Sequence, residues 1–296
     1  MNRRRFIQRT GLATGALLTA PSLLPACSSS DPMSRIGLTT VVFRKRFVST
    51  NPEASGDLLT LEKIPQYLQD RFGIYQPEFW SEHFESREPS YLKGLKEALD
   101  KAHCTLLNIQ ADTPGKDMSD PGHSHLAVEE IKEWIDVGAF LGAKMVRGSF
   151  MRYSLEEGIR STKKLVNYAA SKGLTFLSEN HFDLMSEPEK HTQVAKEVNS
   201  KNFGLLADFG NYPESTDKYE ALKLIAPYTR LVSAKTHGYD KNYEHTGFDF
   251  DRCVRIMEEG GFKGVYSLEQ WEGGLPDYDY EKIVDWMIRH VKANLS

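Results

Sequence analysis

No run of 18 consecutive apolar residues and no low-complexity segment occurs in the 296 residues of this sequence. A membrane-spanning helix requires an apolar run of about that length, so we expect none in the mature chain. Hydrophobic residues make up 40% of the chain and charged residues 26%, as in an ordinary globular protein. Such a chain is long enough for a single large α/β domain with a sizeable core.

Cysteine and glycine-rich loops are also scarce. Of the three cysteines, Cys104 begins an apolar strand pattern and Cys253 lies in a helix pattern. We expect both to be buried thiols rather than a disulfide. No glycine-rich fingerprint follows the first predicted strand, which argues against an open dinucleotide-binding sheet and against a phosphate-bearing substrate.

The first 26 residues have the pattern of an export signal. Three arginines at positions 3–5 precede Phe6-Ile7, as in a twin-arginine signal, and an apolar stretch follows. The run Leu24-Pro25-Ala26-Cys27 resembles a lipobox, so we expect cleavage after residue 26 and a lipid on Cys27, which would be the only membrane contact. Residues 27–34 would then be a tether and residues 35–296 one domain. The alternative is a soluble periplasmic protein cut nearby.

The expected mature chain lacks an excess of positive charge. The full sequence carries a net charge of −4, and residues 1–26 contain four arginines and no acidic residue, so the remainder carries −8. Nucleic-acid binding depends on clustered Lys and Arg, so we expect no nucleic-acid partner.

From residue 35 onward, short apolar runs alternate with amphipathic segments whose apolar residues recur at three- and four-residue spacing. The predicted strands are residues 36–43, 73–80, 105–111, 144–149, 174–180, 203–209, 231–236 and 264–270. The predicted helices are residues 61–71, 91–102, 126–141, 155–171, 187–198, 218–226, 250–259 and 280–293. Eight such units over about 260 residues predict a closed (β/α)₈ barrel with parallel strands, also called a TIM barrel.

Polar side chains at the C-terminal ends of barrel strands converge on one site. Glu179, Asp208, His237 and Glu269 follow four successive strands at spacings of 29, 29 and 32 residues. Three oxygen ligands and one nitrogen ligand with open positions suit a single Mn²⁺, Co²⁺, Mg²⁺ or Zn²⁺ ion. Two carboxylates on one cation can also exchange protons with a substrate. Each of these residues has an alternative structural interpretation, as a helix cap, an ion-pair partner or a hydrogen-bonded strand end.

The strand ends Glu179-Asn180-His181, Asp208-Phe209-Gly210-Asn211 and Gly264-Val265-Tyr266-Ser267-Leu268-Glu269 resemble landmarks of the xylose isomerase-like TIM-barrel family, which belongs with AP endonuclease family 2. The resemblance covers most of the chain after residue 35 and is strongest over residues 174–273. It implies that Glu179, Asp208, His237 and Glu269 bind the metal. It also implies that Glu179 and Glu269 shuttle a proton through an enediol-like intermediate.

The seventh strand departs from the family pattern. Many members read His-x-Lys-Asp there, whereas this chain has Ser233-Ala234-Lys235-Thr236 and places His237 after them. His237 shares a strand face with Ser233 and could reach the metal from beyond the strand end, and His181 is a rival nitrogen ligand. If neither histidine binds, three carboxylates remain, which favours Mg²⁺ or Mn²⁺.

We assign substrate binding to further residues near the strand ends. These are His181, Lys235, Arg147, Asn211, Glu78, Gln110 and Trp271. The hydrogen-bonding side chains suit sugar oxygens, and Trp271 could stack on a sugar ring.

The sequence therefore predicts an exported, metal-dependent isomerase or epimerase that acts on a free sugar or sugar derivative. Lyase-type chemistry on keto-glycosides at the same site stays open, because both reactions begin by removing a proton next to a carbonyl. A non-catalytic, sugar-binding envelope lipoprotein is the alternative from a different class. A phosphodiesterase of the endonuclease type is disfavoured by the acidic mature chain. Barrels of this kind often associate, but no segment identifies an interface.

Overall fold

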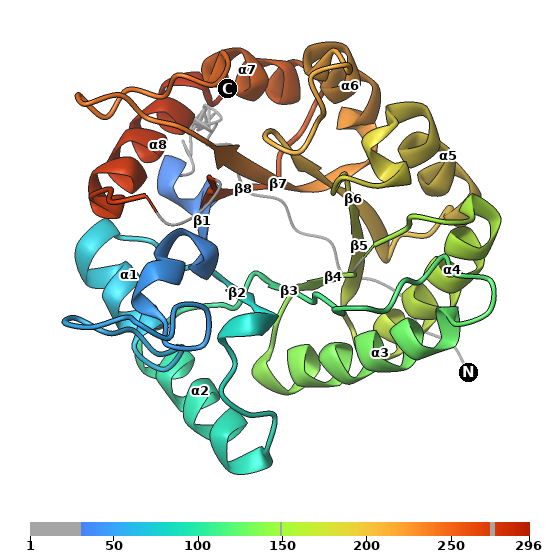
Figure 1. The fold of residues 1–296 in the computed structure, drawn as a ribbon, viewed down its shortest axis with the longest axis horizontal. Helices are drawn as coiled ribbons and strands as arrows, with labels where there is room; N and C mark the ends of the chain where they lie inside the picture. Colours follow the sequence, from blue (N-terminus) through green and yellow to red (C-terminus); the bar gives the residue numbers. More distant parts are fainter. Residues whose placement is uncertain (1–30, 149, 273–275) are drawn as a thin grey trace, which may run out of the picture. The chain divides into compact units, whose positions relative to one another are not determined.

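Figure 1 shows the computed structural model of the chain, which describes residues 31–148, 150–272 and 276–296. Eight parallel strands form a closed barrel in chain order, because β8 pairs with β1 as well as with β7. The helices lie around the strands in the same order (Figure 1). The predicted (β/α)₈ barrel is confirmed. The predicted export signal, the lipid on Cys27 and the start of the tether lie outside the described residues.

Each predicted strand and helix has a counterpart in the structure. The strands are β1 (Ile36–Thr39), β2 (Pro77–Trp80), β3 (Asn108–Gln110), β4 (Met145–Arg147), β5 (Thr175–Glu179), β6 (Phe203–Asp208), β7 (Thr229–Thr236) and β8 (Val265–Gln270). The main helices are α1 (Ile64–Phe72), α2 (Pro89–Lys101), α3 (Ser124–Leu141), α4 (Leu155–Ser171), α5 (Pro188–Val198), α6 (Lys218–Ile225), α7 (Phe250–Glu259) and α8 (Tyr280–Asn294). None of the helices in the described ranges has the length and apolar character to cross a membrane.

Side chains at the helix starts explain why the helices begin where they do. Asp217, Asp249 and Asp279 each accept hydrogen bonds from backbone N–H groups in the first turn of α6, α7 and α8. These donors have no partner within the helix, so a capping oxygen stabilises the start by about 1 kcal/mol. Gly142 ends α3 with a left-handed φ of 76°, which a glycine adopts without strain.

The first strand is shorter than the pattern predicts. We expected a strand over residues 36–43, but β1 ends at Thr39 and the 3₁₀ helix η2 (Thr40–Arg46) follows. The Thr39 hydroxyl accepts a hydrogen bond from the Val41 amide and caps this turn. An apolar run does not distinguish a buried strand from a buried helical turn, so periodicity alone could not place this boundary. The early turn places Val41 against the cavity described below.

The inside of the barrel is apolar at one end and polar at the other. Leu107, Met145, Leu177, Leu206 and Leu231 form a separate buried cluster. Side chains alternate along a strand, so the residue two positions after Leu177 faces the same interior, and that residue is Glu179. In the same way Asp208 follows Leu206, and Lys235 follows Leu231 by four positions. The apolar cluster closes one end, and the charged residues gather towards the carboxyl ends of the strands.

The two cysteines in the described part of the chain are free and buried, as expected from their apolar surroundings. Burial raises the pKa of the Cys104 thiol to about 11, so it stays protonated and unreactive at neutral pH.

Candidate active site

A cavity of about 190 Å³ lies at the carboxyl ends of the strands. It is lined by Val41, Trp80, Gln110, Asp112, Arg147, Glu179, His181, Phe182, Lys235, Glu269 and Trp271. Seven of the predicted site residues are in this set, and they come from β3, β4, β5, β7 and β8 or the turns that follow them. The barrel therefore brings together residues that lie far apart in the sequence, such as Gln110 and Glu269, which are 159 positions apart.

Glu269 and Lys235 form the charged centre on one side of the cavity. They are register partners on β8 and β7, and Lys235 Nζ lies 3.1 Å from Glu269 Oε1. The second carboxylate oxygen accepts hydrogen bonds from Gln110 Nε2 at 3.1 Å and from Ser233 Oγ at 3.2 Å. Lys235 Nζ also donates to Asn211 Oδ1 at 2.9 Å. Both oxygens of Glu269 are thus held by donors from the chain itself.

Arg147 forms the charged centre on the opposite side. Its Nε lies 2.9 Å from Glu179 Oε2, and its Nη1 donates to Asp112 Oδ1 at 2.5 Å. Trp80 Nε1 donates to the other oxygen of Asp112 at 2.7 Å. The Arg147 side chain is almost fully buried, so the Asp112 carboxylate, together with the polar carboxyl group of Glu179, compensates a guanidinium that would otherwise be costly to remove from water.

Asp208, the last residue of β6, and Asn211 in the loop that follows lie next to Lys235. Asp208 Oδ1 accepts hydrogen bonds from the backbone amides of Gly210 at 2.7 Å and Asn211 at 2.9 Å. Its other oxygen faces Lys235 Nζ at 3.9 Å. Asn211 Nδ2 donates to Glu179 Oε1 at 3.4 Å, so its amide joins the lysine to the glutamate. Neither residue lines the cavity itself, although both contact residues that do.

The two cavity glutamates have opposite protonation tendencies. Burial raises the pKa of Glu179 well above its ordinary value, and the nearby Arg147 only partly offsets this effect. Burial also favours the neutral form of Glu269, but the charge and hydrogen bond of Lys235 outweigh it and lower the pKa of Glu269. A pair of carboxyl groups whose pKa values are driven apart is suited to act as acid and base.

The predicted histidines lie in different surroundings. His181 lines the cavity, where its ring stacks on Phe150 with centroids 4.9 Å apart. Burial lowers the pKa of His181 to about 3, so the ring is neutral. His237 lies beyond the end of β7, and its two ring nitrogens contact backbone carbonyls, Nδ1 at 2.7 Å from Trp271 O and Nε2 at 2.9 Å from Gly210 O. This imidazole joins neighbouring loops and does not line the cavity.

The side chains present do not fit the divalent metal that the sequence predicts. In residues 31–148, 150–272 and 276–296, no three or more His, Cys, Asp and Glu side chains form a group that could hold a metal ion. The predicted ligands have other partners: the His237 ring contacts backbone oxygens, Glu179 lies against Arg147, and Glu269 is paired with Lys235. Strand alternation places Ser233, and not a histidine, inside the barrel at this level of β7.

Glu78 lies beneath the cavity and does not line it. Its side chain is fully buried, accepts a hydrogen bond from Asn108 Nδ2 at 2.6 Å and is hydrogen-bonded to the Ser267 hydroxyl. The sequence predicts substrate binding for Glu78 because it lies near the end of the second predicted strand. The position of Glu78 along the predicted strand did not indicate how deeply its side chain would lie in the barrel.

Replacing Glu78 by glutamine is expected to remove part of the pH dependence of stability. Burial raises the pKa of Glu78 to about 7, above the value of about 4.3 for an unfolded chain. Between these values the folded protein retains a proton that the unfolded chain has released. The free energy of unfolding of the wild type therefore falls by about 3 kcal/mol as the pH rises through this window, and E78Q lacks this loss. Urea unfolding at pH 5 and pH 8 measures the difference.

Glu97 on the exposed face of α2 provides the matched control for this experiment. E97Q should retain the pH dependence of the wild type. An E78Q protein that loses as much stability between pH 5 and pH 8 as the wild type would contradict the assignment of a neutral, buried Glu78.

Four residues that line the cavity are not among the predicted site residues, namely Val41, Trp80, Asp112 and Phe182. Asp112 and Trp80 were recognisable from their positions near the ends of β3 and β2, but their hydrogen bond was not. Val41 reaches the cavity only because β1 ends early. Phe182 follows His181 in the β5–α5 loop with a positive φ of 53°, which no local pattern indicated.

A wider hollow of about 660 Å³ adjoins the cavity and shares Trp80, Asp112 and Trp271 with it. Its other lining residues are Arg44, Ser49, Thr50, Glu82, Pro114, Gly115, Phe150 and Arg152. Trp271 is 37% exposed, and the Arg44 guanidinium lies 4.5 Å from its ring centroid. We name this hollow the outer groove. A group attached to a molecule in the cavity would extend into it.

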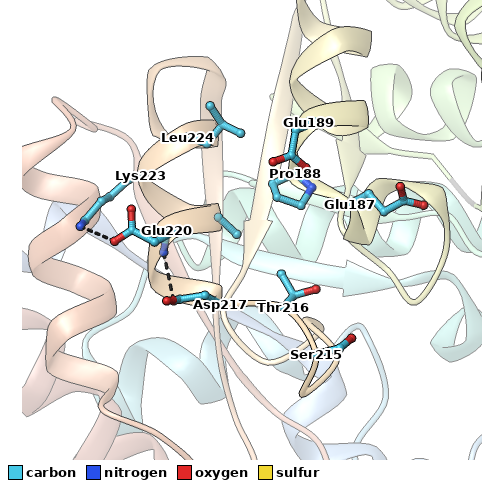
Figure 2. Close-up of a pocket in the computed structure, with 10 residues that line it drawn as sticks. Glu187, Pro188, Glu189, Ser215, Thr216, Asp217, Glu220, Lys223 and Leu224 are labelled. Atoms are coloured by element: carbon cyan, nitrogen blue, oxygen red, sulfur yellow. Dashed lines mark hydrogen bonds and ion pairs between the residues drawn. The ribbon is translucent and has the colours of Figure 1, made fainter.

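Another hollow, of about 640 Å³, lies between α5 and α6 (Figure 2). Two of its acidic side chains have local structural partners. Asp217 caps α6, and Glu220 Oε1 lies 2.7 Å from Lys223 Nζ. This hollow is lined by none of the predicted site residues, and we assign no function to it.

The model of the family described as xylose isomerase-like TIM barrel matches residues 72–290, well over half of the chain. No curated protein matches the chain by sequence. Among solved structures, D-allulose 3-epimerase from Methylomonas sp. is similar with a TM-score of 0.67 at 14% identity, covering 88% of this chain and 98% of that one.

Two further structures have the same fold. A xylose isomerase-like TIM barrel protein from Mycobacterium smegmatis in complex with magnesium has a TM-score of 0.62 at 14% identity, covering 88% of this chain and 98% of that one. The structure of 3-keto-D-glucoside 4-epimerase from E. coli has a TM-score of 0.62 at 14% identity, covering 86% of this chain and 98% of that one. At these identities the likeness concerns the fold.

Proposed function

The chain belongs to the xylose isomerase-like TIM barrel family, and from that premise we propose that it is a sugar isomerase or epimerase that transfers a proton at a carbon next to a carbonyl group. One observation carries the proposal. Glu179 on β5 and Glu269 on β8 have opposite pKa shifts and line the same small cavity. The positively charged side chains of Lys235 and Arg147 line it as well. Solved relatives with this fold include proteins described as sugar epimerases.

In the proposed mechanism Glu269 is the base. Its carboxylate removes the proton from the carbon next to the carbonyl, and the electron pair moves onto the carbonyl oxygen to give an enediolate. Lys235 and Arg147 both line the cavity as donors with a fixed positive charge, so they stabilise the developing negative charge. Asp112 and Glu269 already hold these two side chains in place, so the site does not have to rearrange when the negative charge develops.

Glu179 is the proposed acid. Its raised pKa keeps a proton available, and β5 and β8 are separated by two strands, so the proton returns from a different side of the cavity. Return of a proton to the same carbon from the opposite face gives an epimer. Return to the former carbonyl carbon gives an isomer when the neighbouring hydroxyl also passes its proton to the former carbonyl oxygen. Neutral His181 and Gln110 line the cavity and would bind the remaining hydroxyl groups. Trp271 would contact the carbon face of the ring.

The test is solvent exchange. The purified protein is incubated in D₂O with free ketoses, free aldoses and 3-keto-glycosides, and products are followed by NMR and mass spectrometry. We expect one deuterium in the recovered sugar and a new epimer or isomer. Tight sugar binding without deuterium uptake or product would contradict the proposal and support the sugar-binding lipoprotein instead.

The outer groove favours a second candidate, a lyase acting on keto-glycosides. The same proton removal by Glu269 would be followed by cleavage of the bond between the carbon β to the carbonyl and its glycosidic oxygen. The electrons leave with that oxygen, which takes up a proton. A free monosaccharide does not need a hollow of about 660 Å³ beside the cavity, whereas an attached group would occupy it. Release of the attached group in the same panel identifies the lyase.

We further propose that the protein is exported and held at the envelope by a lipid on Cys27. The twin-arginine-like leader and the lipobox-like run support this. A substrate found outside the cytoplasm would then be a free sugar or a glycoside rather than a phosphosugar.

A further inference from the structure

We propose that the ammonium group of Lys235 takes the place of a divalent cation in this site, so that the protein works without a metal ion. The inference rests on the proposed function only in its expectation that catalysis proceeds without a metal ion. Its structural part concerns how the chain compensates three buried carboxyl groups, Glu179, Asp208 and Glu269.

The ammonium lies among the oxygens that would otherwise surround a cation. Lys235 Nζ is 3.1 Å from Glu269 Oε1, 2.9 Å from Asn211 Oδ1 and 3.9 Å from Asp208 Oδ2. The Lys235 side chain is almost fully buried, as are Glu269 and Asp208. One positive charge at this point offsets the mutual repulsion of two carboxylates, which is also what a bound cation does.

The neighbouring residue on β7 supports this arrangement. Ser233 pairs in register with Asp208 on β6 and with Ser267 on β8, so it lies at the level of the carboxylates. Its hydroxyl donates to Glu269 Oε2, where a longer side chain with a nitrogen donor would compete for the same space. Ser233 thus offers a hydrogen-bond donor to the carboxylate and no strong ligand to a transition metal.

Gly210 makes room for the lysine. A Cβ atom on Gly210 would lie 3.0 Å from both Cγ and Cδ of Lys235 and 2.7 Å from His237 Nε2. The approach to His237 is closer than side chains in proteins come, and the approaches to Lys235 are tighter than ordinary packing, so the lysine stem would have to shift. The absence of a side chain at residue 210 therefore lets the lysine stem extend from β7 to Glu269.

The third carboxyl group is compensated separately. Glu179 Oε2 lies 2.9 Å from Arg147 Nε, and the same guanidinium donates a hydrogen bond to Asp112. A divalent ion entering the centre would have to displace Lys235 from Glu269 and approach two fixed positive charges. An ammonium has three donors, of which two are used on Glu269 and Asn211. The remaining donor is available for a substrate oxygen in the cavity, where it would stabilise an enediolate.

Metal binding by the purified protein tests the inference independently of any activity. The wild type, treated with EDTA and dialysed, is titrated with Mn²⁺, Co²⁺, Mg²⁺ and Zn²⁺, and metal content and thermal unfolding are measured. We expect well under one metal ion per chain and no thermal stabilisation. About one tightly bound ion per chain, lost in E269Q, would overturn the inference. This measurement needs no folded variant of Lys235.

A variant then tests whether Lys235 is the cause. K235M keeps the stem and removes the charge, which leaves Asp208 and Glu269 uncompensated, so Mn²⁺ should bind at least about tenfold more tightly than to the wild type. K223M removes the same charge from the surface of α6 and serves as the control, with no gain in affinity. A folded K235M protein that responds to divalent ions no more than K223M does would contradict the role of Lys235.

The proposed function can fail without affecting this result. If no sugar in the panel exchanges deuterium, the metal titrations still decide whether the ammonium replaces a cation. If exchange occurs, we expect it to persist in EDTA and to be lost in K235M. Exchange that stops in EDTA and returns with Mn²⁺ or Mg²⁺ would overturn the inference while leaving the proposed function intact.

Discussion

Replacing Glu269 by glutamine is expected to lower the turnover of the protein by about a thousandfold while the barrel stays folded. Glutamine has nearly the same shape, and its amide oxygen still accepts a hydrogen bond from Lys235. What is lost is the ability to take up a proton. Lys235, which outweighs the effect of burial, lowers the pKa of Glu269 and keeps this carboxylate ionised. Deuterium uptake and product formation measure the loss, and circular dichroism and thermal unfolding report the fold.

Glu272 provides the matched control, because it follows the same strand but lies outside the cavity and accepts a hydrogen bond from the Tyr278 hydroxyl at 2.9 Å. E272Q should retain turnover within about a factor of three of the wild type. E179Q should be impaired as E269Q is, since it removes the proposed acid. An E269Q protein with more than a tenth of the wild-type turnover would contradict the assignment of Glu269 as the base.

Replacing Arg147 by methionine is expected to lower the free energy of unfolding by about 3–5 kcal/mol at neutral pH. The change leaves Asp112 without the guanidinium that it contacts at 2.5 Å and leaves Glu179 without its ion-pair partner at 2.9 Å. Glu179 is almost fully buried and the Asp112 side chain is only 17% exposed, so water replaces the lost partner only in part. Urea unfolding at pH 7 measures the loss.

The pH dependence of this loss has a definite sign. Burial favours neutral Asp112, but Arg147 outweighs it and lowers the pKa of Asp112. A group with a lowered folded-state pKa stabilises the fold above the unfolded value, about 3.9, and this contribution is lost as the pH falls. The difference between wild type and R147M should therefore shrink below about pH 4. R147M/D112N should recover part of the stability at pH 7, because it removes the unpaired charge.

Arg152 allows a comparison at a less buried position. Its guanidinium stacks on Phe150 beside the outer groove and lies 4.0 Å from Asp117, and nearly half of its side chain is exposed. R152M should cost less than about 1 kcal/mol, as expected for a solvent-exposed ion pair. A loss for R147M as small as that for R152M would contradict the importance of the buried ion pairs of Arg147.

The order of strands and helices was readable from the sequence because it depends on local burial. Each amphipathic helix shows the three- and four-residue spacing of the face that it packs against the barrel, so the predicted residues 155–171 and 250–259 coincide with α4 and α7. Glu179, Asp208 and Glu269 were recognisable for a similar reason. Each lies at the end of an apolar strand or one residue before it, and the carboxyl ends of parallel strands meet at one end of a barrel.

The sequence could not show which residues each polar side chain contacts. His237 shares a strand face with Ser233 and Lys235 in the alternating pattern, but it lies one residue past the end of β7, where that alternation no longer determines direction. Its ring instead contacts the carbonyls of Gly210 and Trp271. These residues are 27 and 34 positions away, and such a contact depends on how three loops pack.

The sequence by itself determined that this protein is an eight-stranded parallel barrel with carboxylates at its strand ends. Only the tertiary structure decided that Lys235 binds Glu269, that Arg147 binds Glu179, and that Glu78 lies beneath the cavity. Periodicity and alternation depend on the chain's own geometry and can be read one segment at a time. The pairing of buried charges depends on the depth and rotamer of each side chain and on the electrostatic field of residues from several different strands. These exist only once the barrel has closed.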